Sequence, residues 1–215
     1  MNIQIAHVSG QREKNKLDKI QRIREATREL FIEKGYDDTT TREIAIRAEV
    51  GIGTIFSYAE NKRDLLFLVA NDDLDEVTRK CEADVSDDAS CLQNLLNLFR
   101  QHYRFYAKQP AISRLLLREM TFYDSGQQAK RFQKTRERNI HLAGSIVRKA
   151  KEQKIIQTDE DPEFVGWVAF CIFQVELRRW LMGKDTNLAS GMARLEKALR
   201  LCMNGWNAKP AAFKK

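Results

Sequence analysis

Apolar residues recur every three to four positions along most of this chain, and the period-2 alternation typical of half-buried strands is hard to find. The segment from Leu17 to Lys34 places Ile20, Ile23, Leu30 and Phe31 on one face, and Gly35 follows as a stop signal. Only 3 prolines and 10 glycines interrupt the 215 residues. The pattern predicts an all-α protein of nine helices.

Helix-start signals divide the segment that follows into short pieces. Residues 40–43 read Thr-Thr-Arg-Glu, a capping box in which Thr40 accepts from the Glu43 amide and Glu43 reaches back. After this second helix, residues 49–51 predict a tight turn, and residues 52–58 a third helix. Asn61 is expected to cap a long fourth helix. Two short helices around a tight turn are typical of a helix-turn-helix.

Beyond Asp72 the acidic content rises, and the polar residues 86–90 form a loop. Further helices are predicted over 92–108, from Pro110 to about Tyr123, over 127–154, over Pro162–Met182, and from Asp185 to about Trp206. We therefore expect three parts: a flexible basic arm over 1–16 with Arg12 and Lys14, a DNA-binding domain over 17–77 with its helix-turn-helix core at 40–59, and a C-terminal domain over 78–215.

Charge favours anionic partners without identifying them, since the formal net charge is +7. Residues 1–65 hold 12 basic and 11 acidic side chains, so phosphate binding there depends on placed groups and helix N-termini. The four cysteines and three histidines lack zinc-ligand spacing, so we expect reduced thiols, no metal and no cofactor. The N-terminus resembles no signal peptide, and the longest apolar run, 164–173, is half of a bilayer span. The predicted location is the cytoplasm, away from the membrane.

A helix-turn-helix reads DNA with the N-terminal end of its second helix, while neighbouring groups hold phosphates. Gly51 and Gly53 are small enough for close approach, and Arg42 is long enough to reach a base edge. Lys62 is a candidate clamp on the phosphate backbone. The predicted DNA-binding residues are Thr40, Thr41, Arg42, Gly51, Ile52, Gly53, Thr54, Ser57, Tyr58 and Lys62.

The order and spacing of LFIEKGY, TTTREIA, VGIGTIFSY and NKRDLL, over roughly residues 17–77, resemble the TetR (tetracycline repressor) family. The resemblance implies a homodimeric bacterial transcription regulator, usually a repressor that a small ligand releases from a pseudo-palindromic DNA operator. Three positions depart from the family pattern. Glu49 replaces the usual turn glycine, so the turn either avoids the left-handed conformation or tolerates its cost. Phe56 replaces a tyrosine that often contacts phosphate, and Ala59 replaces a core phenylalanine.

The C-terminal helices suggest a ligand pocket and a dimer interface. Aromatic and polar residues predict an apolar pocket for an unknown small effector, lined by Phe99, His102, Tyr103, Tyr106, Arg118, Phe122, Trp167, Phe170 and Gln174. The helix over 162–182 is apolar around most of its circumference, and the last helix carries an apolar stripe. Their pairing across a two-fold axis predicts an interface that includes Trp180, Leu188, Met192, Leu195, Leu199 and Trp206. A monomer with these helices in its own core is the alternative.

The basic residues over 130–154 form either a solvated face or a site for an acidic ligand or partner protein. A DNA-bound adaptor controlled by a protein partner is therefore the alternative to a ligand-released repressor. No nucleophile–base set, phosphate loop or metal spacing is found in the sequence, so we do not expect a helical enzyme and expect no catalytic residues.

Overall fold

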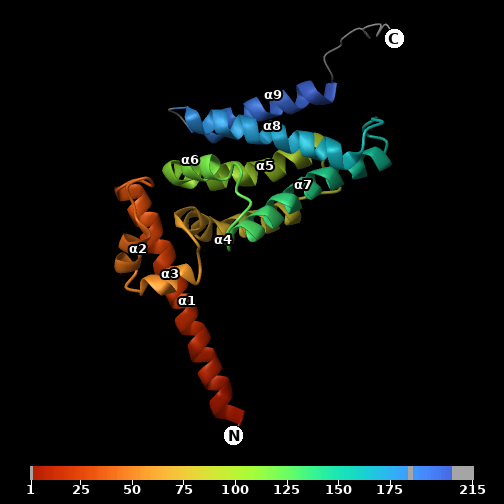
Figure 1. The fold of residues 1–215 in the computed structure, drawn as a ribbon. Coiled ribbons are helices and arrows are strands. Elements are labelled where there is room, and N and C mark those ends of the chain that lie inside the picture. Colours follow the sequence, from red (N-terminus) through yellow and green to blue (C-terminus); the bar gives the residue numbers. More distant parts are fainter. Residues whose placement is uncertain (1, 184–185, 205–215) are drawn as a thin grey trace, which may run out of the picture. The chain divides into compact units, whose positions relative to one another are not determined.

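The computed structural model describes residues 2–183 and 186–204, with side chains from residue 12 onward. This part of the chain is helical and contains no strand, as the sequence predicts (Figure 1). The helices are α1 (Asn2–Glu33), α2 (Thr41–Arg47), α3 (Ile52–Phe56), α4 (Lys62–Ala83), α5 (Cys91–Lys108), α6 (Pro110–Glu119), α7 (Ala129–Glu152), α8 (Pro162–Met182) and α9 (Leu188–Asn204). None of these described helices is both long and apolar enough to cross a membrane.

The described residues form two compact units. The head unit comprises residues 2–73 and 115–134, and the body unit comprises 74–114 together with the described part of 135–204. The sequence predicted one boundary between the DNA-binding domain and the C-terminal domain, between residues 77 and 78. The head unit instead recruits a second stretch of chain, which carries the end of α6, the start of α7 and the loop between them.

Several helix ends differ from the sequence prediction. α1 begins at Asn2, so the expected flexible arm over 1–16 is helical from its second residue. Residues 2–16 contain a single glycine and no proline, so nothing there stops a helix. α6 ends at Glu119 rather than near Tyr123, because Phe122 adopts a φ of 54°, which is incompatible with a right-handed helix.

Apolar faces of α1, α2 and α3 meet in the core of the head unit, where Ile23, Ile44 and Ile55 are fully buried. A second part of this core is aromatic. Phe67 of α4 stacks on Tyr123 with ring centroids 4.0 Å apart, and Phe132 of α7 packs 4.7 Å from Phe67. Tyr123 and Phe132 belong to the recruited stretch, so burial of these rings joins the two parts of the head unit.

In the body unit, α5, α8 and α9 lie side by side (Figure 1). Phe99 of α5 stacks on Phe173 of α8 with centroids 4.6 Å apart, and Leu195 of α9 is fully buried. α7 approaches α8 closely at Gly144 and Gly166. A side chain on Gly166 would lie 2.3 Å from the Gly144 nitrogen, so this helix pair requires glycine there.

Candidate nucleic-acid interface

The start of α2 has the capping box that the sequence predicts. The Glu43 amide donates to Thr40 Oγ1 at 3.2 Å, and the Thr40 amide donates to the Glu43 carboxylate at 2.8 Å. Lys34, which follows α1, and the Thr40 hydroxyl also donate to this carboxylate, and these three donations, Lys34 first, lower the pKa of Glu43 to about 2. The end of α2 that would face a phosphate is thereby fixed in place.

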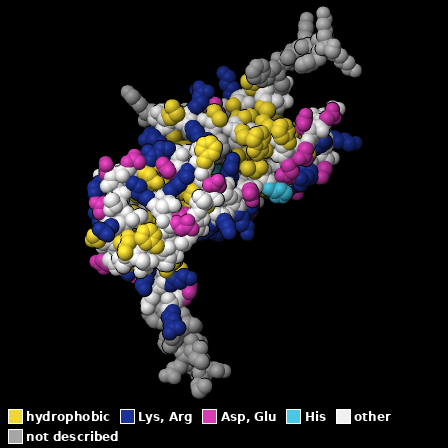
Figure 2. All heavy atoms as spheres, viewed as in Figure 1, with side chains coloured by type: hydrophobic (Ala, Val, Ile, Leu, Met, Phe, Trp, Pro, Cys, Tyr) yellow, Lys and Arg dark blue, Asp and Glu magenta, His cyan; other side chains and the backbone are white. Residues whose placement is uncertain are grey.

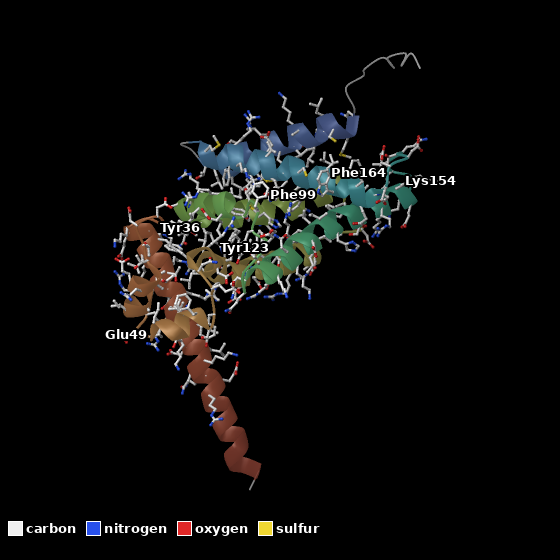
Figure 3. The ribbon with its side chains drawn as sticks, viewed as in Figure 1. Tyr36, Glu49, Phe99, Tyr123, Lys154 and Phe164 are labelled. Atoms are coloured by element: carbon white, nitrogen blue, oxygen red, sulfur yellow. The ribbon has the colours of Figure 1, made fainter. Side chains whose placement is uncertain are left out.

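In the turn between α2 and α3, one residue adopts the left-handed conformation although it is a glutamate and not a glycine. Glu49, labelled in Figure 3, has a φ of 53°. Arg22 of α1 donates to the carbonyl oxygens of Ala48 and Glu49, at 3.0 and 3.3 Å. The chain therefore accepts the backbone strain of Glu49, and Arg22 supports the turn from outside. Sequence reasoning missed Arg22, because its role depends on a contact 26 residues away.

α3 exposes a glycine together with the large apolar side chains of Ile52 and Phe56. Gly51, Ile52, Gly53 and Ser57 are exposed, whereas Thr54 and Tyr58 are half-buried and Ile55 is in the core. A Cβ built on Gly51 or Gly53 would meet no atom within 4 Å, so the protein itself does not require glycine there. The space remains open for another molecule to approach the backbone, which is what close contact with DNA requires.

The remaining predicted DNA-binding residues surround this helix within the head unit. Thr40 and Arg42 are exposed and Thr41 is half-buried at the start of α2. Lys62 begins α4, where its ammonium donates to the Asp37 carbonyl oxygen at 3.0 Å and lies 4.6 Å from the centre of the Tyr36 ring. A DNA phosphate would have to compete with these contacts for Lys62.

The first turn of α4 holds the loop of residues 120–128, hereafter the α6–α7 loop. Arg63 donates to the carbonyl oxygens of Glu119 and Thr121, at 2.8 and 2.6 Å. The fully buried Asp64 carboxylate accepts the hydroxyl of Tyr123, which is labelled in Figure 3. Burial and this hydrogen bond raise the pKa of Tyr123, so its hydroxyl stays protonated as a donor. In the sequence, only the pair Ser125-Gly126 indicated this arrangement. It predicted a loop but not that Arg63 and Asp64 bind it.

The predicted pocket residues do not all lie in the same unit of the structure. Phe99, His102, Tyr103, Tyr106 and Phe170 are buried in the body unit, with Trp167 and Gln174 at its surface. Arg118 and Phe122 belong to the head unit, where Arg118 pairs with Asp37 and the Phe122 side chain is 89% exposed. A hollow of about 190 Å³ in the body unit lies elsewhere, between the α4–α5 loop and α7.

The predicted dimer residues are mostly in the core of the chain itself. Trp180, Met192, Leu195 and Leu199 are buried within the body unit and Leu188 is half-buried, while Trp206 lies outside the described residues. Their periodicity correctly predicted a buried face but not which helices cover it. Apolar side chains on the outer faces of these helices are exposed instead, and Figure 2 shows hydrophobic groups gathered over α8. The exposed large apolar side chains of these two helices are Phe164, Trp167, Val175 and Met182 of α8, with Leu201 and Met203 of α9.

Comparison with known proteins agrees with the geometry of the head. Residues 23–69 match the model of the family described as bacterial regulatory proteins, tetR family. The chain is 29% identical over 94 residues to the fatty acid metabolism regulator protein of Bacillus subtilis. That match covers 44% of this chain and about half of the relative, at 48%.

Two solved structures resemble the chain over most of its length. FadR of Thermus thermophilus, a TetR family transcriptional repressor in complex with lauroyl-CoA, is 25% identical with a TM-score of 0.67. The similarity covers 90% of this chain and 97% of that one. FadR of Bacillus subtilis in complex with stearoyl-CoA has a TM-score of 0.68 at 19% identity, over 86% and 98% of the two chains, which shows a common fold. The helix-turn-helix of the head thus lies within the segment that matches the tetR family model, and the described part of the chain shares the fold of a TetR family transcriptional repressor.

Proposed function

We propose that this protein is a homodimeric repressor that binds a pseudo-palindromic operator and is released from it by a fatty acyl thioester. The observation that carries the DNA-binding part is the pair of exposed glycines at the start of α3, Gly51 and Gly53, which leave open space for a close approach to the backbone. The acyl thioester is inferred from the ligands of the two FadR structures. The aromatic interior of the body unit and the basic residues of α7 suit the two ends of such a molecule.

In this proposal Arg42 reads a base edge and Lys62 holds a phosphate, so their substitutions differ in kind. Arg42→Ala should relax sequence preference, whereas Lys62→Ala should weaken binding to every sequence similarly and lower the salt dependence. Selection of bound DNA from a random pool, followed by affinity measurements at several salt concentrations, tests both. Equal loss on all sequences with Arg42→Ala would refute its base-reading role.

A second copy of the chain is the proposed partner of the exposed apolar side chains of α8 and α9. Trp167 is 45% exposed and Val175 56%, and burial of such groups drives association. The double variant Trp167→Glu, Val175→Glu should be monomeric in sedimentation equilibrium and bind the operator weakly. Phe122→Glu, which changes an exposed aromatic of the head unit, is the control and should remain dimeric. A dimeric double variant would exclude this face.

The state of the Tyr103 hydroxyl is an argument for a ligand that binds in the body unit. This hydroxyl is fully buried and has no hydrogen-bond partner among the described residues, an arrangement that costs free energy until a polar group reaches it. Lauroyl-CoA should raise the melting temperature of the wild-type protein and release it from its operator, and Tyr103→Phe should weaken this response. An operator complex that ignores acyl-CoAs of all lengths would refute the ligand and favour control by a protein partner.

A further inference from the structure

The carboxyl end of the recognition helix α3 is finished by groups from a distant part of the chain. In a continuing helix, the Phe56 carbonyl oxygen would accept the Glu60 amide. That amide instead donates to the Asp64 carboxylate at 3.0 Å. The side-chain amide of Gln127 donates to the Phe56 carbonyl oxygen at 3.0 Å, and that of Gln128 to the Tyr58 carbonyl oxygen at 2.9 Å.

The two glutamines that reach α3 are held by the same carboxylate. The backbone amides of Gln127 and Gln128 donate to Asp64 at 2.8 and 3.0 Å. The Asp64 carboxylate therefore accepts the Glu60 amide, which would otherwise bond the Phe56 carbonyl oxygen. The same carboxylate anchors the two glutamines that donate to the carbonyl oxygens of Phe56 and Tyr58. Charge-assisted bonds to a buried carboxylate are among the stronger hydrogen bonds in proteins, so this arrangement fixes the glutamine backbones firmly.

Gly126 allows the loop to approach so closely. Its φ is 118°, and a Cβ built there would lie 2.5 Å from Asp64 Oδ1. Any other residue would push the loop away from the carboxylate and force strained backbone. The Arg63 guanidinium binds the carbonyl oxygens at the first half of the loop, and the Asp64 carboxylate binds the second half. Two adjacent residues of α4 with opposite charges therefore hold the two halves of the loop.

We propose that Gln127 and Gln128 are positioning residues for the recognition helix, and that the α6–α7 loop must be docked on Asp64 for α3 to read DNA. This rests on the proposed DNA-binding function of α3. Both glutamines leave together when the loop leaves Asp64, so one rearrangement removes the donors from the Phe56 carbonyl oxygen, at the end of α3, and from the Tyr58 carbonyl oxygen just beyond it. Half-buried Gln128 carries more of the effect than exposed Gln127, because water competes less for its hydrogen bond.

The test removes the donors while keeping side-chain length. The variants are Gln127→Met, Gln128→Met and the double variant, in the full-length protein. The matched control is Gln21→Met, since Gln21 is an exposed glutamine of α1 that donates to Glu25 at 2.6 Å and does not reach α3. Gly126→Ala tests the loop without touching either glutamine.

Amide hydrogen exchange of residues 52–59 is measured without DNA, together with the urea midpoint and the affinities for operator and for unrelated duplex. In the double variant, exchange in this segment should rise on the order of tenfold, and the operator-to-unrelated affinity ratio should fall by a similar factor. The urea midpoint should fall by no more than the equivalent of this factor, about 1.4 kcal/mol, because the lost hydrogen bonds also stabilise the native state against global unfolding, and α1 amides that exchange by local opening should not change. Gly126→Ala should reproduce the local exchange, and Gln21→Met should not.

Unchanged exchange at residues 52–59 overturns the proposal, and so does faster exchange throughout the head unit with a fall in the urea midpoint larger than this equivalent, which marks a general structural role. If exchange rises locally but the affinity ratio does not fall, the capping does not serve DNA reading and the proposal is also wrong. If the wild-type protein binds no duplex at low salt, the proposed function fails, and the exchange measurement still decides whether the glutamines position α3.

Discussion

Replacement of Glu49 by glycine tests whether the left-handed turn of the helix-turn-helix stores strain. Glu49 has a φ of 53°, a region that residues with a Cβ rarely adopt. Its amide donates to the Ile46 carbonyl oxygen at 3.1 Å, and its carbonyl oxygen accepts Arg22. These backbone bonds survive in Glu49→Gly. The substitution therefore removes the strained Cβ and the carboxylate, and leaves the rest of the turn intact.

Three contributions set the expected change in the free energy of unfolding. Relief of the left-handed conformation stabilises by about 1–2 kcal/mol, and the greater freedom of glycine in the unfolded chain costs about 0.5–1 kcal/mol. The ion pair that is lost joins Arg22 and the Glu49 carboxylate at 3.7 Å, and that side chain is 84% exposed. Such a pair contributes at the low end of about 0–1 kcal/mol. We expect a net stabilisation of about 0.5 kcal/mol.

Urea unfolding followed by circular dichroism measures this difference. Glu25→Gly is the matched control, because Glu25 is an exposed glutamate inside α1, where glycine should destabilise by about 1 kcal/mol. The two glutamate-to-glycine substitutions should thus shift the urea midpoint in opposite directions. If Glu49→Gly destabilises as much as Glu25→Gly does, the positive φ carries no strain and the reasoning is wrong.

Two further predictions concern the cap and a buried histidine. Thr40→Ala should cost about 1 kcal/mol of stability in the same assay, because the Glu43 amide loses its acceptor, and Thr41→Ala should cost less. Burial lowers the pKa of His102 from 6.5 to about 4, so between these values the unfolded chain binds a proton that the folded chain does not. His102 therefore makes stability fall as the pH drops from 7 to 5, by about 2 kcal/mol, and His102→Leu should remove that part of the urea-midpoint change.

Short-range signals made the head predictable from sequence. The capping box at Thr40, the Asn61 cap and the start of α8 at Pro162 each depend on residues within one helical turn, and the structure has all three. Contacts between distant residues were missed. Asp64 and Tyr123 are 59 positions apart, and neither residue type indicates the other.

The periodicity of apolar residues has a related limit, and it explains why the predicted dimer residues are buried within the chain itself. A stripe such as Met192, Leu195 and Leu199 shows that one face of a helix is buried, but not whether the same chain or a second copy covers it. In this fold α5 and α8 cover that stripe. The side chains left for a partner, Trp167 and Val175 among them, were assigned to the pocket or left unassigned, because α8 is apolar nearly all round.

In the proposed function, the helix that reads DNA, α3, depends on contacts that are far from it in the sequence. α3 has only five residues, and a helix of this length is unstable in isolation because nucleation costs more than so few hydrogen bonds return. Three supports hold it: Ile55 in the core, Arg22 behind the turn, and the Asp64-anchored glutamines at its end. The first two come from the N-terminal 73 residues, but the third comes from the loop between α6 and α7. The support of α3 that is most remote in sequence therefore comes from a loop whose two flanking helices, α6 and α7, are each divided between the head unit and the body unit.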